Sequence, residues 1–298
     1  MNHRAQIRLL ADGRRLHMND GPIDLVIEAF GPRCDVEAAY CAAGARFESI
    51  LDELCSELAF LRSRCFPEAD WPTGSVARRM TAAVMPYAAE NFITPMAAVA
   101  GAVAEEILRA MVSSAELSRA YVNDGGDIAL QLGVDEKFVI GLIERPQRPS
   151  LFATATLNSS SPVRGIATSG WRGRSFSLGI ADAVTVLADH AAAADAAATI
   201  IANAIDLPDH PAIVRVPARE LAPDSDLGDH LVTHGVGQLD RHAVEQALAS
   251  GMRTAEMLLR MGLIRSCALN LQGETRVVGT IGQMMSSATG VERGLVHA

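Results

Sequence analysis

The chain has 298 residues, of which 49% are hydrophobic and 20% are charged, and its net charge is −9. This length suits one large domain of helices and strands or two small ones, and the composition supplies a sizeable core, which excludes extensive disorder. The acidic balance argues against a nucleic-acid partner, because neutralising a phosphate backbone needs a basic patch, and none is visible. A phosphorylated ligand stays compatible with this charge, since a metal ion can supply the positive charge.

The sequence shows no targeting or membrane segment. Residues 1–10 contain neither an apolar run nor a cleavage site, and charged residues interrupt the longest apolar window, 181–205. The five cysteines are an odd number without CxxC spacing, which predicts free and mostly buried thiols. We therefore expect a cytoplasmic protein without membrane contact.

The N-terminal part is predicted to be a β-meander followed by helices. Turn signals divide residues 4–30 into apolar runs that read as strands. From Asp35, a candidate N-cap, apolar residues three or four positions apart predict a helix to about residue 64. Further helices are predicted over 75–88 and 95–112. The small residues of the second one, and the apolar tail of the chain, favour a homodimer.

The remaining sequence alternates strands and helices. Strands are predicted over 119–123, 127–132, 137–143, 152–157, 181–187, 212–216, 264–270 and 275–279, and helices over 190–205 and 240–261. The hairpin signals favour an α+β fold of mixed sheets over a doubly wound sheet. We expect one domain over residues 1–280, with two lobes as an alternative, and a tail over 281–298.

A first candidate site segment is residues 121–128, a strand broken by two glycines and an acid. Its central residues are Asn123, Gly125, Gly126 and Asp127. Glycines let a ligand approach the main chain and permit positive φ. The same residues are also ordinary turn chemistry, so a hairpin turn is the alternative.

A second candidate segment, residues 165–170, reads as a tight loop that ends in Thr168, Ser169 and Gly170. Two hydroxyls and the amides of a turn can lie near phosphates. As a bare tripeptide it is equally typical of a turn with no ligand.

In the third segment, Asp195 and Thr199 lie four residues apart and therefore share one face of a predicted helix. A carboxylate and a hydroxyl, aided by a backbone carbonyl, suit a partly open Mg²⁺ site that substrate phosphates complete. The alternative is structural: Asp195 flanks the end of an alanine-rich helix, and Thr199 bonds back to a helical carbonyl.

The order and residue types of these three segments resemble the ApbE family of FAD:protein FMN transferases. The resemblance spans roughly residues 80 to 205. It implies an ApbE-like (T-fold-related) α+β fold of mixed sheets flanked by helices, with FAD and Mg²⁺ as ligands. It assigns the metal and the catalytic step to Asp195 and Thr199, and the nucleotide to Asn123, Gly125, Gly126, Asp127, Thr168, Ser169 and Gly170.

The sequence departs from the family pattern at two places. Where the family has a Lys-Gly pair, this chain has Ala100-Gly101, and the family's His with its Asp-Pro-x-Thr-Gly segment is replaced by residues 176–182. A cation and a histidine near the phosphates would help to stabilise the charge of a transition state.

These departures leave three functions open. The first is Mg²⁺-dependent attack on the FAD pyrophosphate by a hydroxyl of an acceptor protein or by water, with release of AMP. The second is a flavin-binding accessory protein without transfer chemistry. The third is a pocket rebuilt for a different ligand in a specialised pathway.

A rival metal site is considered at residues 226–242, where His230 and His234 lie four residues apart and His242 follows. Glycines at 228, 235 and 237 argue against the helix that this spacing needs. A surface loop is the default reading.

Overall fold

A computed structural model describes residues 4–68, 70–143, 151–280 and 295–297. Its helices are α1 (Arg33–Ser56), α2 (Leu58–Leu61), α3 (Ser75–Val84), α4 (Val99–Ser114), α5 (Ala191–Ala204), α6 (Ala218–Leu221) and α7 (Arg241–Arg260), with 3-10 turns η1 (Met85–Tyr87) and η2 (Pro95–Ala98). None of the helices in these ranges is both long and apolar enough to cross a membrane.

The strands form one large sheet and two small ones. They are β1 (Gln6–Leu9), β2 (Leu16–Asp20), β3 (Ile23–Phe30), β4 (Arg119–Asp124), β5 (Asp127–Leu132), β6 (Lys137–Ile143), β7 (Leu151–Asn158), β8 (Gly165–Ser169), β9 (Ala183–Ala188), β10 (Ile213–Pro217), β11 (Leu231–Val236), β12 (Ser266–Leu271), β13 (Glu274–Gly279) and β14 (Leu295–His297). Of the predicted tail, 281–294 and 298 lie outside the described residues.

The large sheet has nine strands in the order β1-β2-β3-β4-β5-β8-β9-β12-β13, and each neighbouring pair is antiparallel. A second sheet has the order β14-β6-β7, in which β14 runs parallel to β6. β10 and β11 form a separate pair. The predicted α+β class of mixed sheets flanked by helices is confirmed.

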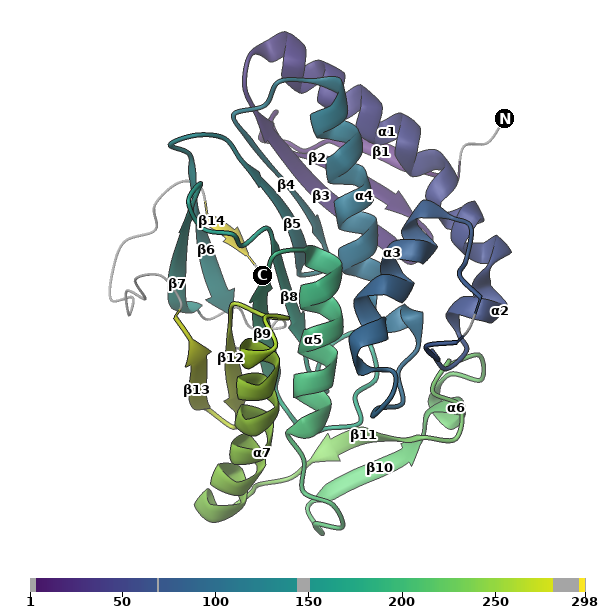
Figure 1. Cartoon of the computed structure of the whole chain (residues 1–298), viewed down its shortest axis with the longest axis vertical. Helices are drawn as coiled ribbons and strands as arrows, with labels where there is room; N and C mark the ends of the chain where they lie inside the picture. Colours follow the sequence, from purple (N-terminus) through teal and green to yellow (C-terminus); the bar gives the residue numbers. More distant parts are fainter. Residues whose placement is uncertain (1–3, 69, 144–150, 281–294, 298) are drawn as a thin grey trace.

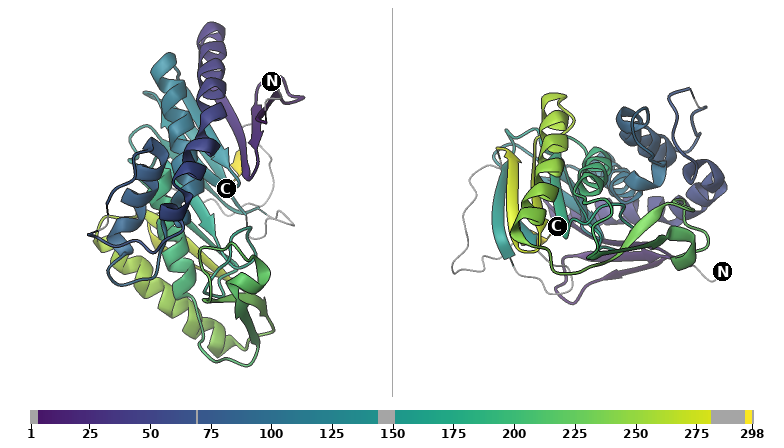
Figure 2. Two further views of the ribbon diagram at one scale, coloured as in Figure 1. Left: turned by 90° about the vertical axis from the view of Figure 1, so that its right-hand side faces the viewer. Right: turned by 90° about the horizontal axis from the view of Figure 1, so that it is seen from below.

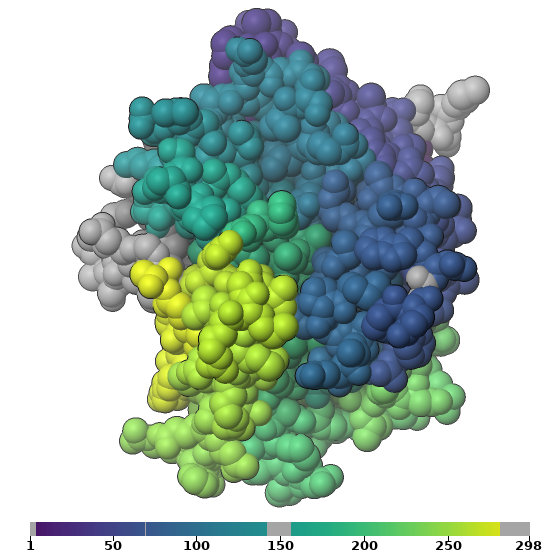
Figure 3. Space-filling view, in the orientation of Figure 1, coloured from purple at the N-terminus to yellow at the C-terminus, as the bar shows by residue number. Residues whose placement is uncertain are grey.

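Helices cover one face of the large sheet, as Figures 1 and 2 show, and the small β14-β6-β7 sheet contributes to a core on the other face. The pleat sends alternate residues to the two sides. On β4, Ala120 and Val122 face the helices, whereas Tyr121 packs with Phe138 of β6. Alanines on the helical side let the helices lie close to the sheet. In the space-filling view, little of the alanine-rich α5 is visible between α7 and the α3 region (Figure 3).

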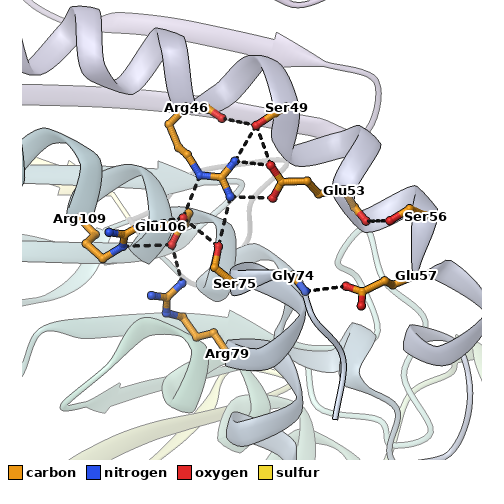
Figure 4. Close-up of polar contacts among 10 residues, drawn as sticks. All are labelled: Arg46, Ser49, Glu53, Ser56, Glu57, Gly74, Ser75, Arg79, Glu106 and Arg109. Atoms are coloured by element: carbon orange, nitrogen blue, oxygen red, sulfur yellow. Dashed lines mark hydrogen bonds and ion pairs between the residues drawn. The ribbon is translucent and has the colours of Figure 1, made fainter. Parts of the chain in front are cut away.

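Helix α4 is held to α1 and α3 by a buried carboxylate. The side chain of Glu106, 1% exposed, accepts hydrogen bonds from Arg46, Arg79, Arg109 and Ser75, as Figure 4 shows. Burial opposes ionisation, but the guanidinium groups outweigh it and hold the pKa of Glu106 well below its usual range. This network fixes one side of the helix whose first turn borders the candidate site.

Helices α4 and α5 cross at Gly101, where a Cβ would collide with the carbonyl oxygen of Ala191. Their ends also cap each other. Asp195 of α5 accepts from the N–H of Gly101 at 3.0 Å, and Glu105 of α4 accepts from the N–H of Ala192 at 2.9 Å. Each acid satisfies a backbone donor that the first turn of the other helix leaves open. The pair of helices is thus locked in one relative position.

Two predicted boundaries are wrong in ways that local geometry explains. The helix predicted over 35–64 begins at Arg33, with Pro32 as N-cap and Asp35 inside the first turn, and it ends at Ser56 before the short α2. Proline has no backbone N–H, and the first N–H groups of a helix have no partner within the helix, so Pro32 suits this start. The helix therefore begins before Asp35, the predicted N-cap.

The predicted loop at 165–170 is also wrong, because residues 165–169 form β8. β8 lies between β5 and β9 and is hydrogen-bonded to both. Pairing on both sides outweighs the local turn signal of glycine and small hydroxyl residues.

All five cysteines are free, as predicted, but three of them are exposed. Cys34, Cys41 and Cys55 lie on α1 at spacings of seven and fourteen residues, which places them on one solvent-facing stripe of the helix. Cys65 and Cys267 are buried. The prediction of mostly buried thiols is therefore wrong.

Candidate functional site

The turn between β4 and β5 is a tight hairpin that requires its two glycines. Gly125 has φ +62° and Gly126 has φ +115°, and Asp124 pairs directly with Asp127. Positive φ at both central residues is the turn geometry that matches the twist of a hairpin. The Asn123 Oδ1 accepts from the N–H of Gly126 at 2.8 Å and fixes the turn. The predicted turn chemistry is present, and it leaves the turn without side chains at its tip.

The pleat divides the predicted residues between the two faces of the sheet. Ala129 faces the helices, so Asp127, two positions earlier, does so as well, and its partner Asp124 shares that face. By the same alternation, Asn123 lies on the opposite face. This is the face of Tyr121, which is two residues earlier on β4.

Thr168 and Ser169 also point to different faces. Ile166 belongs to the core on the side of the small sheet, so Thr168 has that direction too, and its Oγ1 lies 2.9 Å from the Oγ1 of Thr185. Ser169 therefore faces the helices. Thr168 still contributes to the helical side through its backbone, since its N–H donates to the Asp127 Oδ1 at 3.1 Å.

Asp195 lies on α5 above this part of the sheet and is half-buried. It accepts from the backbone N–H groups of Gly101 and Ala100 in the first turn of α4. The chain thus brings Ala100-Gly101 and Asp195 together, as the resemblance implies. Thr199 follows one helical turn later on the same face and is also half-buried. Because a carboxylate can accept about four hydrogen bonds, the helix contacts leave it able to coordinate a cation.

Three carboxylates on the helical face repel one another. Burial, and then the charge of Asp127, raise the pKa of Asp124 to about 8. Burial and the charge of Asp195 raise the pKa of Asp127. Burial raises the pKa of Asp195 to about 7, although the amides of Gly101 and Ala100 oppose this. Nearby positive charges and hydrogen-bond donors therefore do not fully offset the burial and repulsion of these acids. Raised pKa values of this kind are typical of functional sites.

The donor set fits a hard divalent cation. Asp127, Asp195 and Thr199 offer oxygen atoms only, and a cation would offset the burial and the charge repulsion that raise the pKa values of the two acids. Within the described ranges, no group of three or more His, Cys, Asp or Glu side chains converges closely enough to hold a metal by itself. A cation here would take further ligands from its substrate or from water.

Sequence reasoning missed two residues of this site. Asp124 was part of the first segment but was not singled out, and its buried, helix-facing position follows only from the register of β4. Arg174 lies beside it, with its Nη2 3.9 Å from the Asp124 Oδ1. The signal that could have found it is local, since two arginines follow Gly170 within four residues.

The rival site at residues 226–242 is not organised around a metal. His230 stacks on Phe92 with ring centroids 4.0 Å apart, and Asp226 accepts from the Thr94 Oγ1 at 2.5 Å. His234 belongs to β11, and extended backbone separates residues four apart by about 13 Å. The default reading of a surface loop holds only up to His230, because a strand follows.

Comparison with protein families gives a match over most of the chain. A family model described as "AbpE bacteria" matches residues 7–277. UPF0280 proteins of archaea are also similar. One from Methanopyrus kandleri is 40% identical over 144 residues, which is 48% of this chain and 56% of that protein. Another from Methanococcoides burtonii is 42% identical over 113 residues, which is 38% of this chain and 46% of that protein. The matches span about half the length of these relatives.

Solved structures that align with this chain include two flavin transferases. A mutant of the flavin transferase ApbE from Vibrio cholerae aligns with a TM-score of 0.48 and 12% identity, over 89% of this chain and 96% of that one. The apo form of the flavinyl transferase ApbE from Pseudomonas stutzeri aligns with a TM-score of 0.42 and 10% identity, over 93% of each chain.

Proposed function

The chain belongs to the family described as AbpE bacteria, a divergent branch of the ApbE-like proteins, and from that premise we propose that it binds FAD together with Mg²⁺. Membership of this family supports a flavin-related function. The observation that carries the proposal is the group of half-buried acids near the first turn of α4. Asp195 accepts from the N–H of Gly101 there, burial and the charge of Asp195 raise the pKa of Asp127, and Thr199 lies on the same helix face as Asp195.

In this proposal each residue has a separate task. Asp195 and Thr199 hold Mg²⁺, which when bound would neutralise charge on the FAD diphosphate. Gly125 and Gly126 let the nucleotide approach the main chain of the β4–β5 turn. Ser169 and Gly170 line the same side, and Asp127 orients a ribose hydroxyl or a water molecule.

The reaction that we propose is cleavage of the FAD pyrophosphate. A hydroxyl oxygen attacks the phosphorus on the FMN side, a phosphoester bond forms, the phosphoanhydride bond breaks, and AMP leaves; the hydroxyl proton passes to solvent. The attacking oxygen belongs to a Ser or Thr of an acceptor protein, which then carries FMN as a phosphoester, or to water, in which case free FMN is the product. Asp195 and its neighbours hold the diphosphate in place for this attack.

The proposal is tested by AMP release from FAD, with and without Mg²⁺, in wild type, Asp195→Asn and Thr199→Val. Glu105→Gln is the matched structural control, because Glu105 caps α5 as Asp195 caps α4 but lies outside the proposed metal ligands. We expect Mg²⁺-dependent AMP in wild type and in the Glu105 variant only.

Other outcomes separate the alternatives. FAD retained on the protein without AMP release would point to a flavin-binding accessory protein. Loss of AMP release in the Glu105 variant as well would mean that Asp195 acts through helix packing. Failure of FAD to bind at all, measured by absorbance and thermal shift, would refute the flavin proposal.

A further inference from the structure

Three acids come together at the candidate site. Asp124 and Asp127 lie on the face of the sheet that the helices cover, and Asp195 belongs to α5, one of those helices. A nucleotide diphosphate would add further negative charge. Basic side chains that reach this face are therefore the groups to examine.

Arg174 is such a side chain. It lies over the tip of the β4–β5 turn, where a Cβ on Gly125 would collide with its guanidinium group. Its Nη2 is 3.9 Å from the Asp124 Oδ1, which is an ion pair but too long for a hydrogen bond. The side chain is 64% exposed, so a ligand can reach it from solvent.

The loop that carries Arg174 is anchored independently of it. Asp182, whose side chain is 4% exposed, accepts from Arg172 Nε at 2.7 Å, from Trp171 Nε1 at 3.2 Å and from the N–H of Gln272 at 2.6 Å. The N–H of Gly173 donates to the carbonyl of Gly170 at 3.0 Å and closes a turn. Arg172 therefore fixes the loop, while Arg174 extends from it over Gly125.

We propose that Arg174 binds the diphosphate of the nucleotide held at the Asp127–Asp195 site, an inference that rests on the proposed function. A guanidinium group presents a planar fork of donors that matches phosphate oxygens in two parallel hydrogen bonds. The absence of a side chain at Gly125 leaves the space in which the guanidinium group lies. Arg174 thus supplies positive charge in a site that has Ala100 where the related family has lysine.

The test is calorimetric titration of wild type, Arg174→Ala and Arg174→Lys with three probes: FAD with Mg²⁺, inorganic pyrophosphate with Mg²⁺, and riboflavin. Arg219→Ala is the matched control, because Arg219 is 61% exposed and also pairs with one aspartate, Asp229. Thermal midpoints of all variants establish that they are folded.

We expect Arg174→Ala to weaken FAD and pyrophosphate binding by about 10- to 100-fold, the effect of losing a charge-assisted hydrogen bond, and to leave riboflavin binding unchanged. Arg174→Lys should lose less, and Arg219→Ala should match wild type. Riboflavin lacks the diphosphate, so it separates phosphate binding from the general shape of the pocket.

Four results decide the matter. Equal FAD and pyrophosphate affinity in Arg174→Ala and wild type would overturn the inference while the proposed function stands. An equal loss for riboflavin would overturn it too, since Arg174 would then shape the pocket. Wild type that binds neither diphosphate would also overturn it. Pyrophosphate binding that depends on Arg174, without any preference for FAD, would support the inference and refute the flavin proposal.

Discussion

Glu106 in α4 and the acids of the candidate site near the first turn of α4 have opposite pKa shifts. Glu106 is surrounded by three arginines, and its pKa is held well below the usual range. The acids near the first turn of α4 contact backbone amides, and Asp124 has Arg174 at 3.9 Å; burial and their mutual repulsion raise their pKa values.

The direction of the pKa shift separates a carboxylate that stabilises the fold, Glu106, from the acids of the candidate site. Burial opposes ionisation in both places, but Glu106 forms ion pairs with three arginines, whereas Asp124 has Arg174 at 3.9 Å. Asp127 and Asp195 are therefore less well balanced by positive charge than Glu106 is. This difference supports the proposal that a cation completes the site.

The largest expected effect is the loss of the compensated acid. Glu106→Gln would remove the buried carboxylate that three arginines share, and we expect the free energy of unfolding to fall by about 3 kcal/mol. This is the low end for a broken buried pair, because Arg46 keeps Glu53 and Arg79 keeps Glu105. Urea unfolding measures it. Glu53→Gln, at a side chain that is 38% exposed, should cost less than about 1 kcal/mol; equal costs would contradict this view of the network.

The second effect concerns the crossing of α4 and α5. Gly101→Ala introduces a Cβ against the Ala191 carbonyl, and we expect a loss of about 1–3 kcal/mol together with weaker Mg²⁺ and FAD binding, because Asp195 is displaced. Urea unfolding and FAD titration measure the two parts. Gly235→Ala is the control, since its Cβ would have only an ordinary 3.8 Å contact. If Gly101→Ala had the stability of wild type, α4 and α5 could move apart enough to accommodate the Cβ, which would contradict the prediction.

The pH dependence of stability follows from Glu106. Its pKa is lower in the folded chain than in the unfolded one, so its stabilisation is complete above the usual Glu range and is lost as the pH falls toward the folded value. This group alone contributes a slope of at most about 1.4 kcal/mol per pH unit. Urea unfolding from pH 7 down to pH 3 should show a shallower decline in Glu106→Gln than in wild type. If the free energy of unfolding fell equally with pH in wild type and Glu106→Gln, Glu106 would not be a source of the pH dependence.

The smallest change in the free energy of unfolding is expected at the acids of the candidate site, where we expect an increase and not a decrease. Asp127→Asn removes a repelling charge and keeps an oxygen for the N–H of Thr168, so the apo protein should become more stable by about 0.5–1 kcal/mol. The stabilisation of wild type by Mg²⁺ with FAD should be reduced in the same variant. A destabilised apo variant would show that Asp127 is structural, as Glu106 is.

Much of the architecture could be predicted from the chain alone, because the relevant signals are local. Apolar spacing located α5 and α7, and the hydrophobic runs separated by turns located β2 to β5. The i, i+4 relation of Asp195 and Thr199 on one helix face also needed only local geometry. The cysteine stripe on α1 was missed, although its spacing of seven was readable, since burial depends on which face the sheet covers.

The sequence by itself determined the order of the elements, the tight Asn123–Asp127 turn and the set of oxygen donors in the three segments. Only the tertiary structure decided which of these donors meet. Strand pairing converted residues 165–169 into β8 and sent Thr168 and Ser169 to opposite faces, and the register of β4 added Asp124 to the helical side. The crossing at Gly101 set Asp195 against α4, and an anchored loop laid Arg174 over Gly125. Periodicity fixes faces within an element, whereas proximity between elements depends on pairing and packing across long sequence separations.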